Sequence, residues 1–280
     1  MKIGAVVILY HPDEEVINNI VSYSKFCQKI FVFDNTDPLK NNFIKLIKAI
    51  PNCIYLNDGE NKGIATRLNQ AALLATEHSF DWLLTMDQDS SFDNIEKYIN
   101  CCFNYHQKDK VAVFGVQHEH ISMKSDQCNA LPVKQIITSG SLLNLNLYQH
   151  IGHFNEDLFI DQVDFDYCYR AIQNNFQLIR FDNVFLNHSI GKSTIHRSPK
   201  NFKIVKRSLH SPVRIYYMVR NFLYMKYKYE NEFKKEITLS KLDLMIRIKN
   251  HILYSPDRYH VIKHIALGIQ HYRSKRMGKL

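Results

Sequence analysis

Short apolar runs alternate with helix-like segments along the first 116 residues, and this alternation restricts the possible folds more than any other feature. Runs of strand length occupy residues 3–10, 29–34, 53–56, 81–86 and 111–116. Apolar residues at helical spacing fill the intervals at 15–27, 42–50, 64–78 and 95–106. Strands that alternate with helices in this way form βαβ units with right-handed crossovers. The sequence therefore predicts a doubly wound, Rossmann-like α/β domain with a mainly parallel sheet.

The pattern changes in the second half of the chain. We expect a further strand at 136–139 and amphipathic helices from Lys200 onward. Segment 159–170 should start as a strand or loop and be helical by the time it reaches Tyr167. Residues 1–191 carry 15 Lys and Arg against 22 Asp and Glu, whereas residues 192–280 carry 21 against 5. This charge division predicts an α/β domain over 1–195 and a basic, helical C-terminal region over 196–280, packed on the domain and facing an anionic partner.

The cysteines and the apolar stretches bear on the cellular compartment. No CxxC spacing occurs among the six cysteines, which favours reduced thiols in a cytoplasmic protein: Cys27, Cys53, Cys101, Cys102, Cys128 and Cys168. The longest apolar stretch near the N-terminus, residues 5–10, is far shorter than the roughly 18–20 residues of a membrane-spanning helix. No small-residue cleavage site follows it. We therefore expect neither a membrane span nor secretion.

Polar side chains follow the predicted strands at the points where those strands end. In open parallel sheets a ligand binds beyond the carboxyl ends of the strands, so these positions are the first candidates for a site. They are Tyr10-His11-Pro12, Asp34-Asn35-Thr36, Asn57-Asp58-Gly59 and Asp87-Gln88-Asp89-Ser90.

One of these strand ends and the start of the helix after residue 60 both suggest that a nucleotide binds. The carboxylates of Asp87 and Asp89 leave one strand end together, and such oxygen ligands suit Mg²⁺ or Mn²⁺ bound to a diphosphate. The alternative is a solvated turn. Asn61-Lys62-Gly63 opens the next helix, with Asn69 further along it, and a helix N-terminus favours an anion. There the alternative is an ordinary turn with an N-cap.

The segment 159–170 places three acids within six residues, followed by an arginine. Crowded like charges are costly unless a cation or hydrogen-bond donors offset them. Asp166 and Arg170 lie one helical turn apart and are expected to form a structural pair. Asp164 then remains as a candidate general base, against the alternative of a solvated acidic loop. His188 follows another apolar run, and a single histidine there is either a metal ligand or a plain core or surface residue.

Several short motifs follow one another along the chain in a fixed order. They are His11-Pro12, Asp34-Asn35, Asn61-x-Gly63-Ile64-Ala65-x-x-x-Asn69, Trp82-x-x-x-x-Asp87-Gln88-Asp89-Ser90, Ser139-Gly140, Phe159-Ile160-Asp161-x-Val163-Asp164, Arg170 and His188-x-x-Gly191. In this order the set resembles the family 2 glycosyltransferases. The Asp-Gln-Asp-Ser form is similar to their bacterial rhamnosyltransferase branch, as is the later signature Ser211-Pro212-x-Arg214-x-Tyr216-Tyr217-x-x-Arg220-Asn221. The resemblance covers about residues 3–225.

The resemblance implies a GT-A fold and an inverting transfer from a nucleotide-diphosphate sugar. Asp164 matches the base that deprotonates the acceptor hydroxyl, and Asp89 with His188 would bind the divalent metal, Mn²⁺ or Mg²⁺. Donor-binding roles fall on Tyr10, His11, Asp34, Asn61, Gly63, Asn69, Asp87 and Arg220. Roles near the acceptor or in support of the catalytic residues fall on Ser139, Gly140, Asp161, Asp166 and Arg170. Asp166 stands where much of the family has Glu, and Gln162 where the branch often has an aromatic residue.

The basic tail suggests a membrane surface as a further partner. Segment 214–228 mixes tyrosines with cations, and basic amphipathic helices bind anionic lipid headgroups. With a lipid-linked oligosaccharide as acceptor, we expect peripheral association with the inner face of the plasma membrane. The alternative is a helical surface packed by its tyrosines.

Two other functions compete with glycosyl transfer. A nucleic-acid-binding protein would explain the basic tail, but it leaves the acids at the strand ends unexplained because carboxylates repel phosphates. A sugar nucleotidyltransferase would use a nucleotide, a metal and aspartates, yet it needs a Gly-rich phosphate loop, which His11-Pro12-Asp13-Glu14 does not provide. Among donors, dTDP-rhamnose is favoured, with UDP-activated hexoses or a galactofuranose donor as alternatives.

Overall fold

A computed structural model describes residues 2–37, 42–118, 127–188, 193–197 and 204–280. The chain divides into two compact units. The first comprises Met1–Phe159 and Val163–Ser189, and the second comprises Ile160–Gln162 and Ile190–Leu280. The three residues Ile160–Gln162 therefore leave the first unit and belong to the second.

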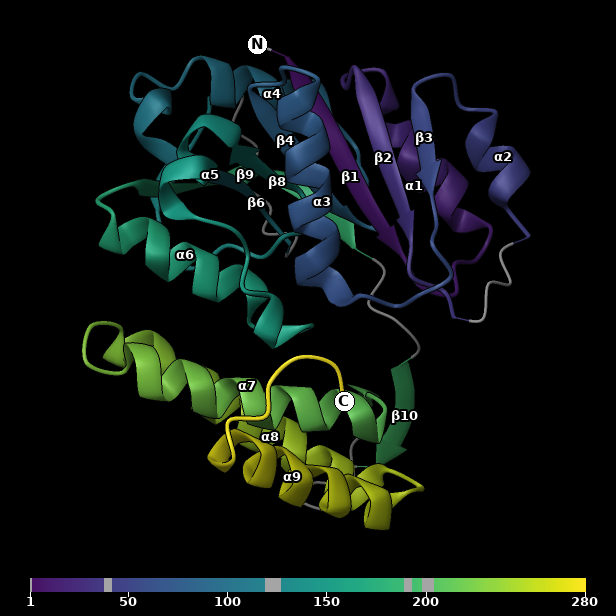
Figure 1. The fold of residues 1–280 in the computed structure, drawn as a ribbon, viewed down its shortest axis with the longest axis vertical. Helices are drawn as coiled ribbons and strands as arrows, with labels where there is room; N and C mark the ends of the chain where they lie inside the picture. The colour runs from purple at the N-terminus through teal and green to yellow at the C-terminus, as the bar shows by residue number, and fades with distance from the viewer. Residues whose placement is uncertain (1, 38–41, 119–126, 189–192, 198–203) are drawn as a thin grey trace. The chain divides into compact units, whose positions relative to one another are not determined.

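The first unit is built on a mainly parallel sheet (Figure 1). Its central strands run parallel in the order β3-β2-β1-β4: Cys53–Leu56, Lys29–Asp34, Ile3–Leu9 and Trp82–Asp87. The order continues through β8, β6, β9 and β5, with β7 beside β9: Ser141–Asn144, Val111–Gln117, Gln177–His188, Ser90–Phe92 and Ala130–Pro132. Strands β6 and β9 are also parallel. The predicted doubly wound α/β fold is confirmed.

Helices cover both faces of this sheet because its buried strands are apolar on both sides. Residues Ala5, Val7 and Leu9 of β1 pack in one cluster with the helices α1 (Glu15–Ser24) and α4 (Ile95–Phe103). The opposite face carries α3, which crosses in front of β1 and β4 in Figure 1. The remaining helical elements of this unit are α2, α3, α5, α6, η1 and η2: Ile44–Lys48, Gly63–Glu77, Leu145–Ile151, Val163–Gln173, Lys108–Lys110 and Glu156–Leu158.

One sequence-based expectation for the middle of the chain is wrong. Residues 136–139 form no strand; the strand begins after Gly140, which adopts a left-handed turn conformation with φ of 74°. This strand, β8, is buried and pairs antiparallel with both β4 and β6. The helix expected by Tyr167 is present, and it begins four residues earlier, at Val163 (α6).

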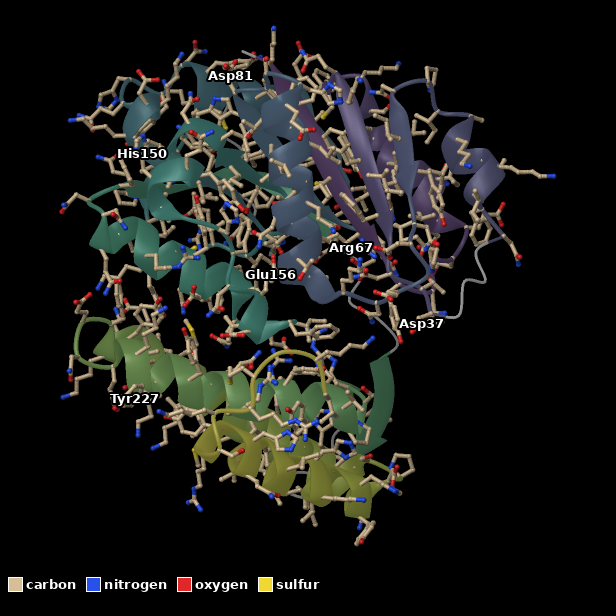
Figure 2. All side chains as sticks on the ribbon, viewed as in Figure 1. Asp37, Arg67, Asp81, His150, Glu156 and Tyr227 are labelled. Carbon is tan, nitrogen blue, oxygen red and sulfur yellow. A yellow bond between two sulfur atoms is a disulfide. The ribbon has the colours of Figure 1, made fainter. Side chains whose placement is uncertain are left out.

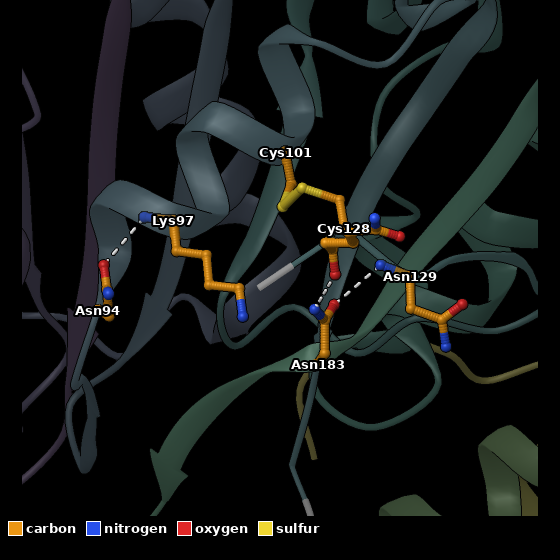
Figure 3. The surroundings of a disulfide bond; sticks show 7 residues. Asn94, Lys97, Cys101, Cys128, Asn129 and Asn183 are labelled. Atoms are coloured by element: carbon orange, nitrogen blue, oxygen red, sulfur yellow. Dashed lines mark hydrogen bonds between the residues drawn. A yellow bond between two sulfur atoms is a disulfide. The ribbon is translucent and has the colours of Figure 1, made fainter. Parts of the chain in front are cut away.

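The cysteines also differ from expectation, because Cys101 and Cys128 form a disulfide (Figure 3). Cys101 lies on α4, and the backbone N–H of Asn129 beside Cys128 donates to Asn183 Oδ1 at 3.0 Å. The other four cysteines are free thiols. Burial raises the pKa of the Cys27 thiol to about 12, which keeps this sulfur protonated.

The second unit contains a two-stranded antiparallel sheet and three helices. The strands are β10 and β11, Ser193–Arg197 and Ile204–Ser208. The helices are α7, α8 and α9: Pro212–Tyr229, Lys234–Tyr254 and Arg258–Arg273. The predicted helical C-terminal region is confirmed, although residues 204–208 are extended rather than helical. None of the helices within the described ranges is both long and apolar enough to cross a membrane.

Most aromatic residues of helix α7 are buried, which corrects the expectation that they face a lipid surface, whereas Tyr227 near the end of the helix is 84% exposed. Tyr216, Tyr217 and Phe222 are all buried, and the fully buried Arg220 packs its guanidinium against the rings of both Tyr216 and Tyr217. The guanidinium of Arg220 donates to the Tyr216 hydroxyl and, at 2.7 Å, to the carbonyl of Gly278. The cations and tyrosines in the first half of α7 therefore reflect internal packing, the alternative stated above, whereas Tyr227 and Lys228 remain exposed.

Candidate active site

The candidate site is centred on the carboxyl end of β4. Parallel register places Asp87, the last residue of β4, opposite Ile8 of β1. The chain then turns through Gln88 and Asp89 and enters β5 at Ser90. Asp87 and Asp89 are partly exposed, whereas Ser90 is fully buried. Both predicted carboxylates therefore lie on one short turn at the expected edge of the sheet.

The side chain of Gln88 ties this turn to the end of β1. Its Oε1 accepts from the backbone N–H of Tyr10 at 2.8 Å, and its Nε2 donates to the carbonyl of Tyr10 at 3.2 Å. The Gln88 carbonyl in turn accepts from Asn19 Nδ2 of α1 at 2.9 Å. This reciprocal pairing fixes the loop that carries Tyr10 and His11 beside the aspartates. The ring of Tyr10 is about half exposed and thus accessible to a ligand.

Strand pairing also brings His188 to the aspartate turn. β5 and β9 are antiparallel, and His188 lies directly opposite Ser90, the residue after Asp89. Opposed residues in such a pair have Cα atoms about 5 Å apart. The side chain of His188 lies outside the described part of the chain. At the level of the backbone, its predicted pairing with Asp89 agrees with the register.

These residues fit a divalent cation that is shared with a substrate diphosphate. Within the described ranges, no three His, Cys, Asp or Glu side chains form a ready-made metal cluster. Mg²⁺ and similar cations are commonly held by one or two carboxylates together with substrate phosphates, so a complete protein cage is not required. Asp89 has a carboxylate oxygen of the kind such a cation requires, and the register brings the backbone of His188 to the same turn.

Ser139 and Gly140 precede β8 and help to hold this turn in place. The Ser139 hydroxyl donates to the Ser90 hydroxyl at 2.8 Å and accepts from the backbone N–H of Asp87 at 3.4 Å. A Cβ added to Gly140 would lie 2.8 Å from a methyl group of Val116. Ser139 is buried, so its described role is to hold the strand ends together.

Asp34 organises the loop after β2. Its carboxylate accepts from the backbone N–H of Thr36 at 2.9 Å and from the Tyr55 hydroxyl at 2.7 Å. Thr36 Oγ1 accepts in turn from the backbone N–H of His11 at 2.9 Å. Asp34 is fully buried, so it holds the two loops that flank the expected base position.

The loop before α3 is held by Arg67, a residue that the sequence analysis did not select. Its guanidinium donates to both carboxylate oxygens of Asp58, at 2.6 and 3.0 Å, and at 2.7 Å to Oδ1 of Asn35. The hydrogen bond from Arg67 holds the pKa of Asp58 well below its usual range. Arg67 is almost completely buried, and Figure 2 labels it beside α3. The loop after β3 is therefore anchored to the loop after β2.

The N-terminus of α3 is largely occupied by protein groups. Asn61 Oδ1 accepts from the backbone N–H of Gly63 at 3.0 Å, and the Phe159 carbonyl accepts from Ile64 at 2.7 Å. Gly63 adopts φ of 79°, and an added Cβ would lie 2.5 Å from the Phe159 ring. Only glycine suits this position. The first two donors of the helix are thus engaged within the protein, which agrees with the N-cap alternative.

Asn69 is fully engaged in holding the loop that precedes α6. Its Oδ1 accepts from the Tyr148 hydroxyl at 2.7 Å and from the backbone N–H of Phe154 at 2.8 Å. Its Nδ2 donates to the Phe154 carbonyl at 3.0 Å and to Glu156 Oε1 at 2.7 Å. Figure 2 labels Glu156 near α3. A side-chain amide makes four hydrogen bonds at most, so in this conformation Asn69 has none left for a nucleotide sugar.

Asp164 lies in the first turn of α6 and is partly exposed. Its Oδ1 accepts from the backbone N–H of Phe165 at 2.9 Å. Asp166 is fully buried, and its Oδ2 accepts from Arg170 Nε at 2.9 Å, which is the predicted structural pair. Arg170 also donates to the carbonyls of Ile151 and Gly152, where α5 ends. Asp166 and Arg170 therefore fix α6, and Asp164 is the partly exposed acid of this turn.

Two further predicted residues belong to the second unit. Asp161 pairs with Arg214, and Arg220 is buried within α7 as described above. The sequence assigned no role to Gln88 or Arg67, because both act through contacts between residues far apart in the chain. Gln88 lies within the Asp87–Ser90 motif, but nothing in the spacing of that motif indicates a partner at Tyr10.

Comparison with known proteins places this geometry in context. No protein-family model matches the chain. Among curated proteins, the chain is similar to the dTDP-rhamnosyl transferase RfbF of Shigella flexneri, with 26% identity over 243 residues, which are 79% of this chain and 78% of RfbF.

Solved structures share the fold at low sequence identity. TarS from S. aureus superposes with a TM-score of 0.56 and 14% identity over 96% of this chain and 49% of TarS. TarS 1–349 in complex with UDP-GlcNAc gives 0.55 and 14% over 99% of this chain and 88% of that one. GalNAc-T7 with UDP, GalNAc and Mn²⁺ gives 0.60 and 10% over 98% and 57%. The chain thus spans about half the length of the longer solved proteins.

Proposed function

We propose a donor and an acceptor for this chain, which is a glycosyltransferase with the GT-A fold that uses a nucleotide sugar. The proposed reaction moves rhamnose from dTDP-rhamnose to a hydroxyl of a growing cell-surface polysaccharide or lipid-linked oligosaccharide, with inversion at the anomeric carbon. The observation that carries this proposal is the meeting of the Tyr10 loop, the Asp87–Asp89 turn and His188 at one edge of the sheet. Similarity to RfbF supports rhamnose as the sugar.

In the proposed reaction, the carboxylate of Asp164 takes the proton from the acceptor hydroxyl. The hydroxyl oxygen then forms a bond to the anomeric carbon while the bond from that carbon to the diphosphate oxygen breaks. Asp164 suits this role because it is the partly exposed acid of the first turn of α6, whereas Asp166 is buried against Arg170. Proton removal raises the nucleophilicity of the acceptor as the new bond forms.

On the donor side, the Tyr10–His11 loop and the neighbouring Asp34 loop would flank the nucleotide base. Asp89 and His188 would hold Mn²⁺ or Mg²⁺, and Asp87 would lie near the base or ribose. A bound divalent cation neutralises negative charge on the departing diphosphate. Gln88 contributes by keeping the base loop and the aspartate turn in a fixed relation.

A thermal-shift screen of nucleotide sugars with Mn²⁺ tests the donor. A ligand that binds only the folded state raises the melting temperature. We expect dTDP-rhamnose with Mn²⁺ to give the largest increase, and UDP-GlcNAc to give a smaller one. Turnover should then require an added acceptor. A larger shift with a UDP-hexose would replace the proposed donor, and donor hydrolysis with no acceptor requirement would contradict a transferase.

We also propose peripheral association with the inner face of the plasma membrane, through α8 rather than α7. Leu239, Leu242 and Ile246 recur at helical spacing on α8, and each is more than half exposed. The exposed residues Lys235 and Lys249 lie one turn beyond either end of this apolar stripe. Together with the excess of 21 basic over 5 acidic residues in 192–280, this surface suits an anionic lipid headgroup layer.

Replacing Leu239, Leu242 and Ile246 together with glutamine tests this surface. The charges are kept, so only apolar burial is lost, at roughly 1 kcal/mol for each half-buried side chain. We expect affinity for phosphatidylglycerol-containing vesicles at low salt to fall roughly 100-fold in a sedimentation assay. Leu73→Gln, a similarly exposed leucine on α3, should leave binding unchanged. Equal binding by the triple variant would reject the α8 surface.

A further inference from the structure

The segment that leads into α6 has an unusual backbone. Phe159, Asp161 and Gln162 adopt φ values of 61°, 67° and 66°, in the left-handed region that residues other than glycine rarely occupy. Such a backbone conformation is strained and persists only where its surroundings hold it. Asp164, the proposed base, follows Gln162 by two residues. The conformation of this segment therefore sets the direction in which the chain enters the first turn of α6.

Two side chains of α7 hold this segment. Arg214 Nη2 donates to Asp161 Oδ1 at 2.7 Å, and Arg214 Nε lies 2.6 Å from Asp161 Oδ2. Asn221 Nδ2 donates to the carbonyl of Ile160 at 2.7 Å and to that of Asp161 at 3.0 Å. Arg214 thus holds the side chain of Asp161, and Asn221 holds the backbone at Ile160 and Asp161.

Both contacts depend on how α7 itself is built. Arg214 and Asn221 are seven residues apart, which places them on the same face two turns from each other. Ser211 caps the helix by accepting from the backbone N–H of Arg214 at 3.3 Å, and Pro212 occupies the first turn. Asn221 is fully buried, and its Oδ1 accepts from Arg220 Nε at 3.0 Å. The backbone at Arg214 and the side chain of Asn221 are therefore held by contacts other than those with the segment.

We propose that Arg214 and Asn221 are positioning residues for the base Asp164. They hold residues 160–162 in the left-handed conformation and thereby orient the Asp164 carboxylate toward the acceptor hydroxyl. This inference rests on the proposed function, since it assigns a task to the same base. It gives a specific role to the Arg214 and Asn221 positions of the signature Ser211-Pro212-x-Arg214-x-Tyr216-Tyr217-x-x-Arg220-Asn221, which donor chemistry leaves unexplained.

The first test separates orientation of the base from binding of the donor. Arg214→Ala and Asn221→Ala are expected to lower kcat about 10- to 100-fold, because a misplacement of about 1 Å can cost 10²-fold in rate. The affinity for the nucleotide sugar should stay within about twofold of wild type. The matched control is Lys226→Ala, which removes an ion pair to Glu230 on the same helix and should keep the wild-type kcat. Equal loss of donor affinity would overturn the proposal.

The second test uses glycine, which adopts a positive φ without steric cost. Adding Gln162→Gly to Arg214→Ala should recover at least about tenfold of the lost kcat, since the segment then needs less support. Asn175→Gly relieves another positive φ, 61°, after the end of α6 and should recover nothing. A purely structural role for Arg214 predicts no difference between these two glycine variants, and that result would overturn the proposal.

Hydrogen exchange provides a readout that does not depend on turnover. The amides of residues 160–164 should exchange faster in Arg214→Ala and Asn221→Ala than in wild type, while those of β1 and β4 stay protected. Unchanged exchange at 160–164 would contradict the proposal even if activity fell. A wild-type protein that transfers no sugar from any nucleotide sugar would instead refute the proposed function, so the two failures are distinguishable.

Discussion

Replacing Asp164 with asparagine is expected to lower kcat for sugar transfer by about 10³-fold, within the 10²- to 10⁴-fold range of general bases. Asparagine has nearly the same shape, and its Oδ1 can still accept from the backbone N–H of Phe165, so the start of α6 should be preserved. It cannot take a proton from the acceptor hydroxyl. Donor affinity should remain within about twofold of wild type, measured by calorimetric titration of the nucleotide sugar.

The matched control for this experiment is Asp157→Asn, which neutralises an exposed acid in the same region of the chain. It should keep the wild-type rate. Loss of both transfer and donor affinity in Asp164→Asn would indicate a structural task for this carboxylate. Full activity of Asp164→Asn would show that another acid is the base.

Replacing Asp89 with alanine is expected to abolish metal-dependent donor binding. The change removes one oxygen ligand from a site that has few protein ligands, so affinity for Mn²⁺ together with dTDP should fall by about 10²-fold or more. Calorimetric titration of Mn²⁺ in the presence of dTDP measures this without any turnover. Binding of dTDP alone should change much less, because the loops around Tyr10 and Asp34 are held by hydrogen bonds of Gln88, Thr36 and Tyr55.

Glu96→Ala is the control for Asp89→Ala, since it removes an exposed acid from the first turn of α4 at the same cost in net charge. It should titrate like wild type. A wild-type metal affinity in Asp89→Ala would reject the metal role of the aspartate turn, and Asp87 would become the next residue to test.

The sequence predicted the first half of the sheet well, because each parallel strand there is a short apolar run and each crossover helix has clear periodicity. Strands β1 to β4 and β6 lie within a residue or two of their expected ranges. The antiparallel strand β8 was misplaced for a physical reason. Residues 136–139 are as apolar and β-branched as a strand, and only the left-handed turn at Gly140 moves the strand to 141–144.

The remaining errors concern contacts between distant residues, which local patterns do not encode. Cys101 and Cys128 are 27 residues apart, so no spacing motif identified their disulfide. The aromatic and basic residues of α7 have the composition of a lipid-facing helix, yet Tyr216, Tyr217, Arg220 and Phe222 are buried, whereas Tyr227 and Lys228 are exposed. Composition alone does not distinguish the two, because both environments favour tyrosine beside a cation.

The sequence placed the strand-end residues of the candidate site correctly, but it did not reveal the hydrogen bonds that hold the surrounding loops. Asp87, Asp89 and the backbone of His188 meet at one edge, as the rule for parallel sheets indicates. Asn69, in contrast, was expected to bind the donor, and its four hydrogen bonds within the protein became visible only in three dimensions.

The bond between the Ile64 N–H and the Phe159 carbonyl has a consequence for how the two substrates affect each other. It joins the first turn of α3, on the nucleotide side, to the residue just before Ile160–Gln162. With no room for a Cβ at Gly63, a displacement of this turn must carry residue 159 with it. If the proposed donor contacts this turn and the proposed acceptor contacts the segment after residue 159, binding of one substrate would alter the affinity for the other, and thermodynamic reciprocity requires the same factor in both directions.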